Sequence, residues 1–190
     1  MRVFGIDPGS TRTGYGCIDS DGRRHQLVCC GAIVLPLSVS FPEKLQLIHR
    51  GLVSLIREAR PDCVVVENVF HAANARSALL LGHARGVVLL AAVEAGLPIA
   101  EYTPAEVKRA VVGYGRADKT QVQQMIKLLL GLDEVPSPHD VADALAVAVC
   151  HLNQAGPIMA AAHAAARGPG AAEAGGTPRS WRQWKPKHGQ

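Results

Sequence analysis

Hydrophobic and polar positions along the first third of the chain follow a pattern that predicts strands. Residues 2–7 form a short apolar run that stops at a Pro-Gly turn, and residues 14–19 form a second run after it. The Asp21-Gly22 pair favours a tight hairpin turn, because glycine tolerates positive φ, and it leads into a third run over residues 25–35. The pattern therefore predicts three antiparallel strands at the start of the domain.

From Pro42 onward the spacing of apolar residues predicts helices that alternate with strands. Helical periodicity begins at Pro42 and ends before Pro61, and residues 63–66 form a β-branched run typical of a buried parallel strand. Further elements are expected as a helix over 74–95, a strand over 97–102, a short helix from Pro104, a helix from Asp118 to Leu130, and a last helix from Ser137-Pro138 to about Leu152. Together these elements predict an α/β domain with a mixed five-stranded sheet, three antiparallel strands and then parallel ones, flanked by helices.

Composition divides the chain into a domain and a tail. Residues 1–154 carry 15 Lys and Arg against 15 Asp and Glu, so the net charge of +4 belongs to residues 155–190. This tail is rich in Ala, Gly and Pro and has no apolar periodicity, so we expect it to be disordered. Trp181 and Trp184 lie among basic residues, which fits binding of single strands or a protein partner, but a dispensable tail fits the same pattern.

Cysteine usage and hydropathy indicate the compartment. The 5 cysteines are odd in number and show no CxxC spacing, which favours free thiols in a reducing cytoplasm. The first residues show no signal-peptide pattern, and no stretch reaches the roughly 18 uninterrupted apolar residues of a membrane span. We therefore expect a soluble cytoplasmic protein that makes no use of a membrane.

Four acidic residues stand out by their positions in the predicted elements. Asp7 and Glu67 each end a predicted strand, at the edge where open α/β sheets place their ligands. Asp140 and Asp143 share one face of the last helix, ahead of an apolar run. If the four carboxylates meet, their mutual repulsion requires hard cations such as Mg²⁺ or Mn²⁺. Two such ions catalyse phosphodiester hydrolysis, so the acids predict a metal-dependent nuclease.

Taken singly, two of these acids also have a structural explanation. Asp7 could open the turn that follows it, and Asp140 could favour the macrodipole in a first helical turn. Glu67 and Asp143 adjoin buried apolar runs, where an acid needs a partner, and are harder to explain in this way. The combination of the four favours a site.

Four segments resemble the RuvC family of Holliday-junction resolvases, in order and in spacing, over about residues 1–154. They are Gly5-Ile6-Asp7-Pro8-Gly9 with Gly14-Tyr15-Gly16, Glu67-Asn68-Val69-Phe70, Val107-Lys108 with Asp118-Lys119, and Asp140-Val141-Ala142-Asp143-Ala144-Leu145-Ala146. The resemblance implies a ribonuclease H-like fold, a homodimer, and symmetric nicking of opposed strands at four-way junction DNA in recombination and repair. It also implies RuvA and RuvB as partners, and as metal-binding catalytic acids Asp7, Glu67, Asp140 and Asp143.

The resemblance and side-chain chemistry together indicate DNA-binding residues. Lys108 and Lys119 match basic positions that the family uses close to DNA, and Lys119 lies in the first turn of a predicted helix, where a phosphate is favoured. Phe70 matches an aromatic that stacks on a junction base, although it could also cap the core. Arg76 and Arg116 complete the predicted set.

Two further features leave alternatives open. His139 precedes Asp140 and could be a ligand, a proton shuttle or a polar group at the helix start; some relatives place a histidine where Asp140 stands, and this chain keeps the acid. Gly82 and Gly86 lie four residues apart on the long helix and permit close helix approach. The family dimerises through this region, but packing within one chain fits the same spacing.

Two other functions fit part of the sequence. The segment from Gly5 to Gly14 resembles the phosphate-binding hairpin of actin-like ATPases and sugar kinases, but those proteins need two such domains and this chain has one. A relative of the same fold that acts on RNA, or a catalytically silent junction-binding module, is the second alternative. The four intact acids argue against a catalytically inactive module, and the helix that carries Lys119 favours the resolvase.

Overall fold

The computed structural model describes the backbone of residues 1–68 and 74–165, and side chains as far as residue 154. Most bounds lie within two residues of the predicted ones. In chain order the elements are β1 Arg2–Asp7, β2 Arg12–Ser20, β3 His25–Val34, α1 Phe41–Ala59, β4 Cys63–Glu67, α2 Ala75–Glu94, β5 Ile99–Tyr102, α3 Pro104–Val112, α4 Lys119–Leu130 and α5 His139–Ala165.

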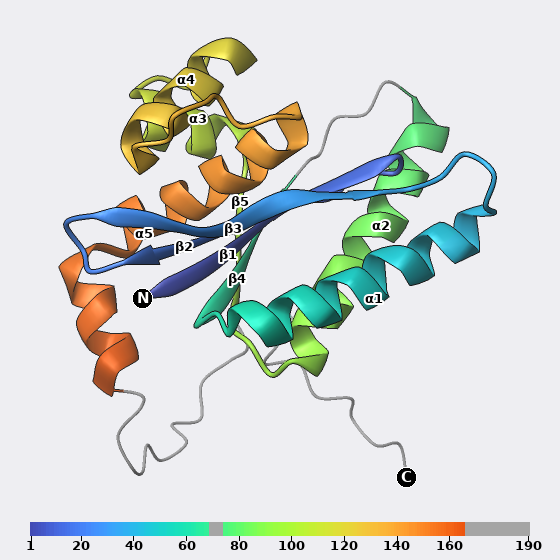
Figure 1. Cartoon of the computed structure of the whole chain (residues 1–190), viewed down its shortest axis with the longest axis horizontal. Coiled ribbons are helices and arrows are strands. Elements are labelled where there is room, and N and C mark those ends of the chain that lie inside the picture. Colours follow the sequence, from blue (N-terminus) through green and yellow to red (C-terminus); the bar gives the residue numbers. More distant parts are fainter. Residues whose placement is uncertain (69–73, 166–190) are drawn as a thin grey trace, which may run out of the picture.

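The strands form one mixed sheet in the order β3-β2-β1-β4-β5. The first three strands pair antiparallel, and β4 joins β1 in parallel before β5 adds to β4 in parallel. Helices α1 and α2 lie on one side of this sheet, and α3, α4 and α5 lie on the other (Figure 1). The predicted mixed five-stranded sheet is confirmed.

Alternation along the strands divides the core into two layers. Val3 and Val65 pack with Leu145 of α5, whereas Phe4 and Val64 pack on the opposite side, under α1 and α2. Because side chains of a strand alternate between the two faces, the residues at odd positions of β1 and β4 point toward α5. Both strand-end acids therefore face α5.

Glycines let α5 lie directly on the sheet. A Cβ atom at Gly5 would stand 2.1 Å from the carbonyl oxygen of Ala144, and one at Gly14 would stand 2.0 Å from that of Asp140. At Gly16 an added Cβ would meet the Leu145 side chain at 2.4 Å. Only glycine allows this approach, which carries the start of α5 to the end of β1.

Capping interactions fix the helix starts that bear on the site. The Asp118 carboxylate accepts a hydrogen bond from the Gln121 backbone N–H at 2.8 Å, and the Gln121 side chain accepts one from the Asp118 N–H at 3.0 Å. This reciprocal pair is a capping box. It sets Lys119 as the first residue of α4.

The predicted end of the last helix is wrong. Helix α5 continues to Ala165, beyond the expected end at Leu152 and into the segment expected to be disordered. Alanine has the highest intrinsic helix propensity, so an alanine-rich segment can stay helical without an apolar face to bury. Residues 166–190, with Trp181 and Trp184, lie outside the described residues, as do residues 69–73.

Helix α2 is the one helix of the described ranges that is long and apolar enough to cross a membrane by length and composition. Those two criteria alone are weak evidence, since helices of globular domains meet them too. The helix packs against α1 on one side and leaves apolar side chains exposed on another, among them Leu79 and Leu90. Helix α2 therefore has an exposed apolar side within the described residues.

Candidate active site

Asp7 and Glu67 lie side by side at the end of two parallel strands. Ile6 of β1 is in register with Val66 of β4, so the next residue on each strand is one of the two acids. Both side chains are half-buried and point toward α5. The predicted meeting of the two strand-end carboxylates is thus built into the sheet register.

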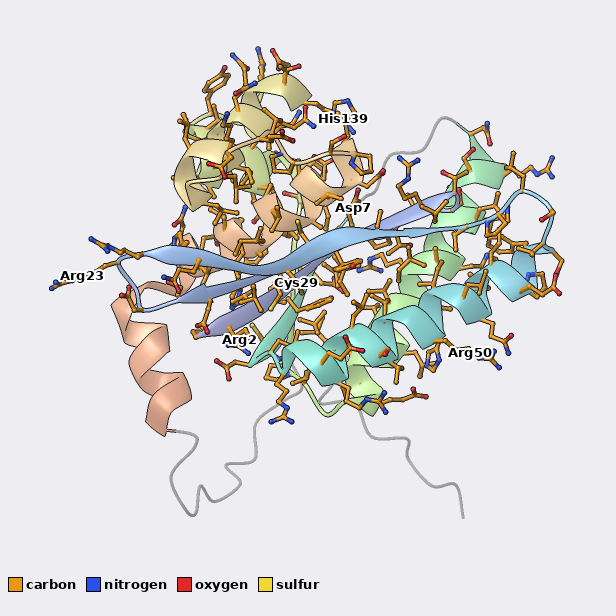
Figure 2. All side chains as sticks on the ribbon, viewed as in Figure 1. Arg2, Asp7, Arg23, Cys29, Arg50 and His139 are labelled. Carbon is orange, nitrogen blue, oxygen red and sulfur yellow. The ribbon has the colours of Figure 1, made fainter. Side chains whose placement is uncertain are left out.

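Helix α5 supplies the other two acids from above the sheet. Asp140 lies in its first turn, one turn before Ala144, which rests on Gly5. Figure 2 shows Asp7 at the end of the sheet near the start of α5, where His139 is labelled. The side chains of Asp140 and Asp143 are 33% and 21% exposed, so solvent and a substrate can reach them.

The pKa of Asp7 is affected by all three of the other acids. Burial raises the pKa of Asp7 from 3.8 to about 8, and the negative charges of Glu67, Asp143 and Asp140 add to that rise. The positive charge of Lys119 acts in the opposite direction. A buried carboxyl among three others favours its protonated form until a cation compensates the charge.

Glu67 experiences the same crowding to a smaller degree. Burial, followed by the charge of Asp143, raises its pKa to about 7, while Lys119 and Lys108 lower it. The Lys119 ammonium lies 3.3 Å from the Asp143 carboxylate, and that carboxylate is the main cause of the raised pKa of Lys119. Two lysines therefore border the acids.

The donor set fits a hard divalent cation, although the side chains are not gathered around one point. Carboxylate oxygens are the ligands that Mg²⁺ and Mn²⁺ prefer. Within residues 1–68 and 74–154, however, no three His, Cys, Asp or Glu side chains lie close enough together to hold an ion as they stand. The two acids of α5 each contact a basic residue instead, Asp140 contacting Arg12 and Asp143 contacting Lys119. An ion that takes these two carboxylates as ligands would compete with Arg12 and Lys119 for them.

The other candidate residues are exposed at the ends of helices, and one lies outside the described residues. Arg76 is exposed at the start of α2, and Arg116 is exposed just before α4. His139 is exposed as the first residue of α5. Phe70, the predicted stacking residue, lies outside the described residues.

One neighbour of the acids, Arg12, was not predicted from the sequence. Its Nη1 lies 3.3 Å from Oδ2 of Asp140. Arg12 precedes Gly14 and Gly16 by two and four residues, and these glycines face α5. The strand alternation that places Gly14 under α5 therefore contained the signal.

A mixed sheet in this order, with acids ending two central parallel strands and a helix adding two more, is the arrangement of ribonuclease H-like nucleases. Residues 3–151 match the family model described as crossover junction endodeoxyribonuclease RuvC. The chain belongs to the RuvC family of metal-dependent endonucleases.

Bacterial relatives carry the same family name. The RuvC proteins of Syntrophomonas wolfei and Citrifermentans bemidjiense are 49% and 55% identical to this chain, covering 80% and 82% of it and 89% and 94% of their own lengths. The RuvC of Trichlorobacter lovleyi is 47% identical and covers 98% of this chain and 100% of its own. In that relative the likeness continues past residue 154, where we expected it to end.

Two solved structures of Thermus thermophilus RuvC have the same fold. The structure without a named substrate is 37% identical with a TM-score of 0.75, covering 82% of this chain and 95% of its own. The structure described as a complex with Holliday junction substrate is 36% identical with a TM-score of 0.79, covering 84% and 97%. The predicted ribonuclease H-like fold is confirmed.

Proposed function

We propose that this protein resolves Holliday junctions by paired, symmetric, metal-dependent hydrolysis of two phosphodiester bonds, in recombination and DNA repair. The observation that supports this most directly is that four carboxylates, from β1, β4 and α5, lie close enough together for Glu67, Asp143 and Asp140 to raise the pKa of Asp7. The complex of the similar Thermus thermophilus protein with junction DNA supports the choice of substrate. Membership of the RuvC family favours this function over the ATP-binding alternative.

The more buried and the more exposed acids are proposed to coordinate the metal ions from different sides. Asp7 and Glu67, the two whose pKa values are raised most, would hold Mg²⁺ or Mn²⁺ at the centre of the site. Asp140 and Asp143, more open to solvent, would complete the coordination of two ions from the helix side. When bound, two such ions activate a water molecule and stabilise the leaving oxygen of a phosphodiester. By holding these ions, the four side chains would determine where the water and the phosphate bind.

Basic residues around the acids are proposed to bind the DNA backbone. The Lys119 side chain is 68% exposed and lies at the N-terminus of α4, where backbone N–H groups also attract a phosphate. Lys108 is close enough to Glu67 to lower its pKa. We propose that Arg76 and Arg116 extend this surface and that Phe70 stacks on a junction base, the latter by family resemblance alone.

The exposed apolar side of α2 is proposed to form a homodimer interface. Leu79 and Leu90 are 64% and 50% exposed beside an open groove that also includes Leu45 of α1. A Cβ at Gly82 or Gly86 would meet nothing within 4 Å among the described residues, so these glycines serve no close packing there. A second copy pressed against α2 would use the space and place two active sites on one junction.

The partners, the domain boundaries and the cellular compartment are also proposed. We propose RuvA and RuvB as partners, by family resemblance. The division into a nuclease domain over residues 1–154 and a tail over 155–190 is likewise proposed from composition. None of the 5 cysteines forms a disulfide, which supports a reducing cytoplasm as the compartment.

The test is cleavage of a synthetic mobile four-way junction with Mg²⁺, with Mn²⁺, or with EDTA. We expect wild type to make paired nicks that EDTA abolishes, and Asp7→Asn to lower the rate by at least about 100-fold while it still binds the junction. Asp133→Asn, which removes an exposed acid before α5, is the matched control and should cut like wild type. Cleavage that prefers RNA or linear duplex, or that survives Asp7→Asn, would refute the proposal.

A further inference from the structure

Arg12 reaches the active site from a fixed position on the sheet. It is the first residue of β2, on the same face as Gly14 and Gly16, and both glycines lie beneath α5. Its Nη1 is 3.3 Å from Oδ2 of Asp140. The guanidinium therefore lies between β2 and the first turn of α5.

The backbones at both ends of this contact are held in place. A Cβ at Gly14 would stand 2.0 Å from the carbonyl oxygen of Asp140, and one at Gly9 would stand 2.1 Å from that of Arg12. Gly9 belongs to the turn that directly follows Asp7. The backbone of Arg12 thus packs against the turn that follows Asp7, and its side chain contacts that of Asp140.

The contact is looser than the other arginine ion pairs of the described residues. Arg2 contacts Asp19 through Nη2 at 2.9 Å and Nε at 3.3 Å, and Arg85 contacts Glu101 at 2.7 Å. Arg12 uses one nitrogen, at 3.3 Å. Charge-assisted hydrogen bonds between such groups are usually about 2.7–2.9 Å long. A long, single contact is one that a competing cation can replace.

Helix stability does not explain an arginine at this place. The N-terminal end of a helix carries partial positive charge, so a carboxylate in the first turn of α5 is favourable without help and a cation there is unfavourable. The ion pair of Arg2 with Asp19 lies at the opposite end of β1 from Asp7 and involves none of the four acids. The contact is better explained by the chemistry of Asp140.

We propose that Arg12 is a positioning residue for Asp140, which it holds away from the other acids until a divalent ion displaces it. This inference rests on the proposed function, because the ion belongs to that proposal. It accounts for the absence of a gathered ligand set among the described residues while four carboxylates border one site. Because a partly exposed ion pair is weak, we expect the competition to change metal affinity by about twofold to fivefold.

The experiment is calorimetric titration of Mn²⁺ into the DNA-free protein. We expect Arg12→Gln to bind Mn²⁺ about twofold to fivefold more tightly than wild type, and Arg12→Lys, which keeps the charge, to bind with nearly wild-type affinity. In an Asp140→Asn background the Arg12→Gln change should lose most of this effect, because the pair no longer exists. Thermal unfolding of each variant, followed by circular dichroism, checks that the fold is retained. A purely structural role would lower the melting temperature without tightening Mn²⁺ binding.

Other outcomes would overturn the inference. Unchanged or weaker Mn²⁺ binding by Arg12→Gln would show that Arg12 does not compete with the ion. A tightening that persists in full in the Asp140→Asn background would show that Arg12 acts only as a distant charge. Wild type that binds no Mn²⁺ would refute both this inference and the proposed metal site, whereas a failure confined to the Arg12 variants would leave the proposed function intact.

Discussion

At the residue scale, the site is a set of carboxylates whose charges are compensated unequally. Asp140 and Asp143 each have a basic partner at 3.3 Å. Asp7 and Glu67 have none at that distance in the described residues, and burial raises their pKa values to about 8 and about 7. The two strand-end acids therefore depend most on a cation from solution or on a proton.

This dependence predicts how stability changes with pH in EDTA. The folded pKa of Asp7 lies near 8, against an ordinary value of 3.8, so between these values the folded protein holds a proton that the unfolded chain has lost. Its contribution is fully present below about pH 4 and is lost as pH rises toward 8, at a slope of up to about 1.4 kcal/mol per pH unit.

We expect urea unfolding in EDTA at pH 5 to 9 to show wild type losing stability relative to Asp7→Asn as pH rises. Mg²⁺ or Mn²⁺ should restore the loss, because an ion replaces the proton as the compensating charge. Asp133→Asn serves as the control and should follow wild type, since that acid is exposed. Parallel curves for wild type and Asp7→Asn would show that Asp7 titrates normally.

At the element scale, the positions of Asp140 and Asp143 relative to Asp7 depend on how closely α5 lies on β1 and β2. We expect Gly14→Ala to lower the junction cleavage rate at least about tenfold and to destabilise the fold by about 1–3 kcal/mol, because the new Cβ would meet the Asp140 carbonyl at 2.0 Å and push the helix away. Gly115→Ala is the matched control, since its Cβ would come no closer than 3.4 Å to any neighbouring atom of the described residues. The rate of junction cleavage in a quenched time course measures the first effect, and urea unfolding measures the second. A Gly14→Ala protein as active as the control would contradict this account of α5.

The elements themselves were largely predictable, because apolar periodicity and turn residues are local signals. Asp7 and Glu67 could be found because each ends a predicted strand, and the register of β1 and β4 then brings them together. Strand alternation indicates that Arg12 lies on the face of the sheet that α5 covers, but its contact with Asp140 joins residues 128 positions apart and could not be read from a local pattern. The end of α5 was predicted too early because the prediction relied on the loss of apolar periodicity after Asn153. The alanine-rich segment that follows is helical through intrinsic propensity, which needs no apolar periodicity.

At the scale of the whole molecule, the two faces of the sheet differ in how their helices are covered. Residues 144–150 of α5 are fully buried beneath α3 and α4, as suits a central helix. Helix α2 buries Ala84, Val88, Ala91 and Ala92 and leaves leucines and two uncrowded glycines on its outer side. The apolar outer side is unusual for a helix at the surface of a monomer, and it is the basis for expecting a dimer.

The dimer is tested by placing charge on that outer side. We expect Leu79→Glu with Leu90→Glu to weaken self-association at least about 100-fold, because each leucine buried in an interface contributes about 1.5–3 kcal/mol. Both side chains are exposed within one chain, so the fold itself should be little affected. Leu128→Glu is the matched control, since Leu128 of α4 is 71% exposed and lies away from α2.

Sedimentation velocity would give the association state, and a cruciform plasmid would report whether the two nicks occur in one binding event. The double variant should sediment as a monomer and release singly nicked circles, whereas wild type and Leu128→Glu should yield linear product from paired cuts. A monomeric variant that still makes paired cuts would show that paired cutting does not depend on this interface. A variant that remains dimeric would show that the two copies meet elsewhere, and the exposed leucines of α2 would then need another partner.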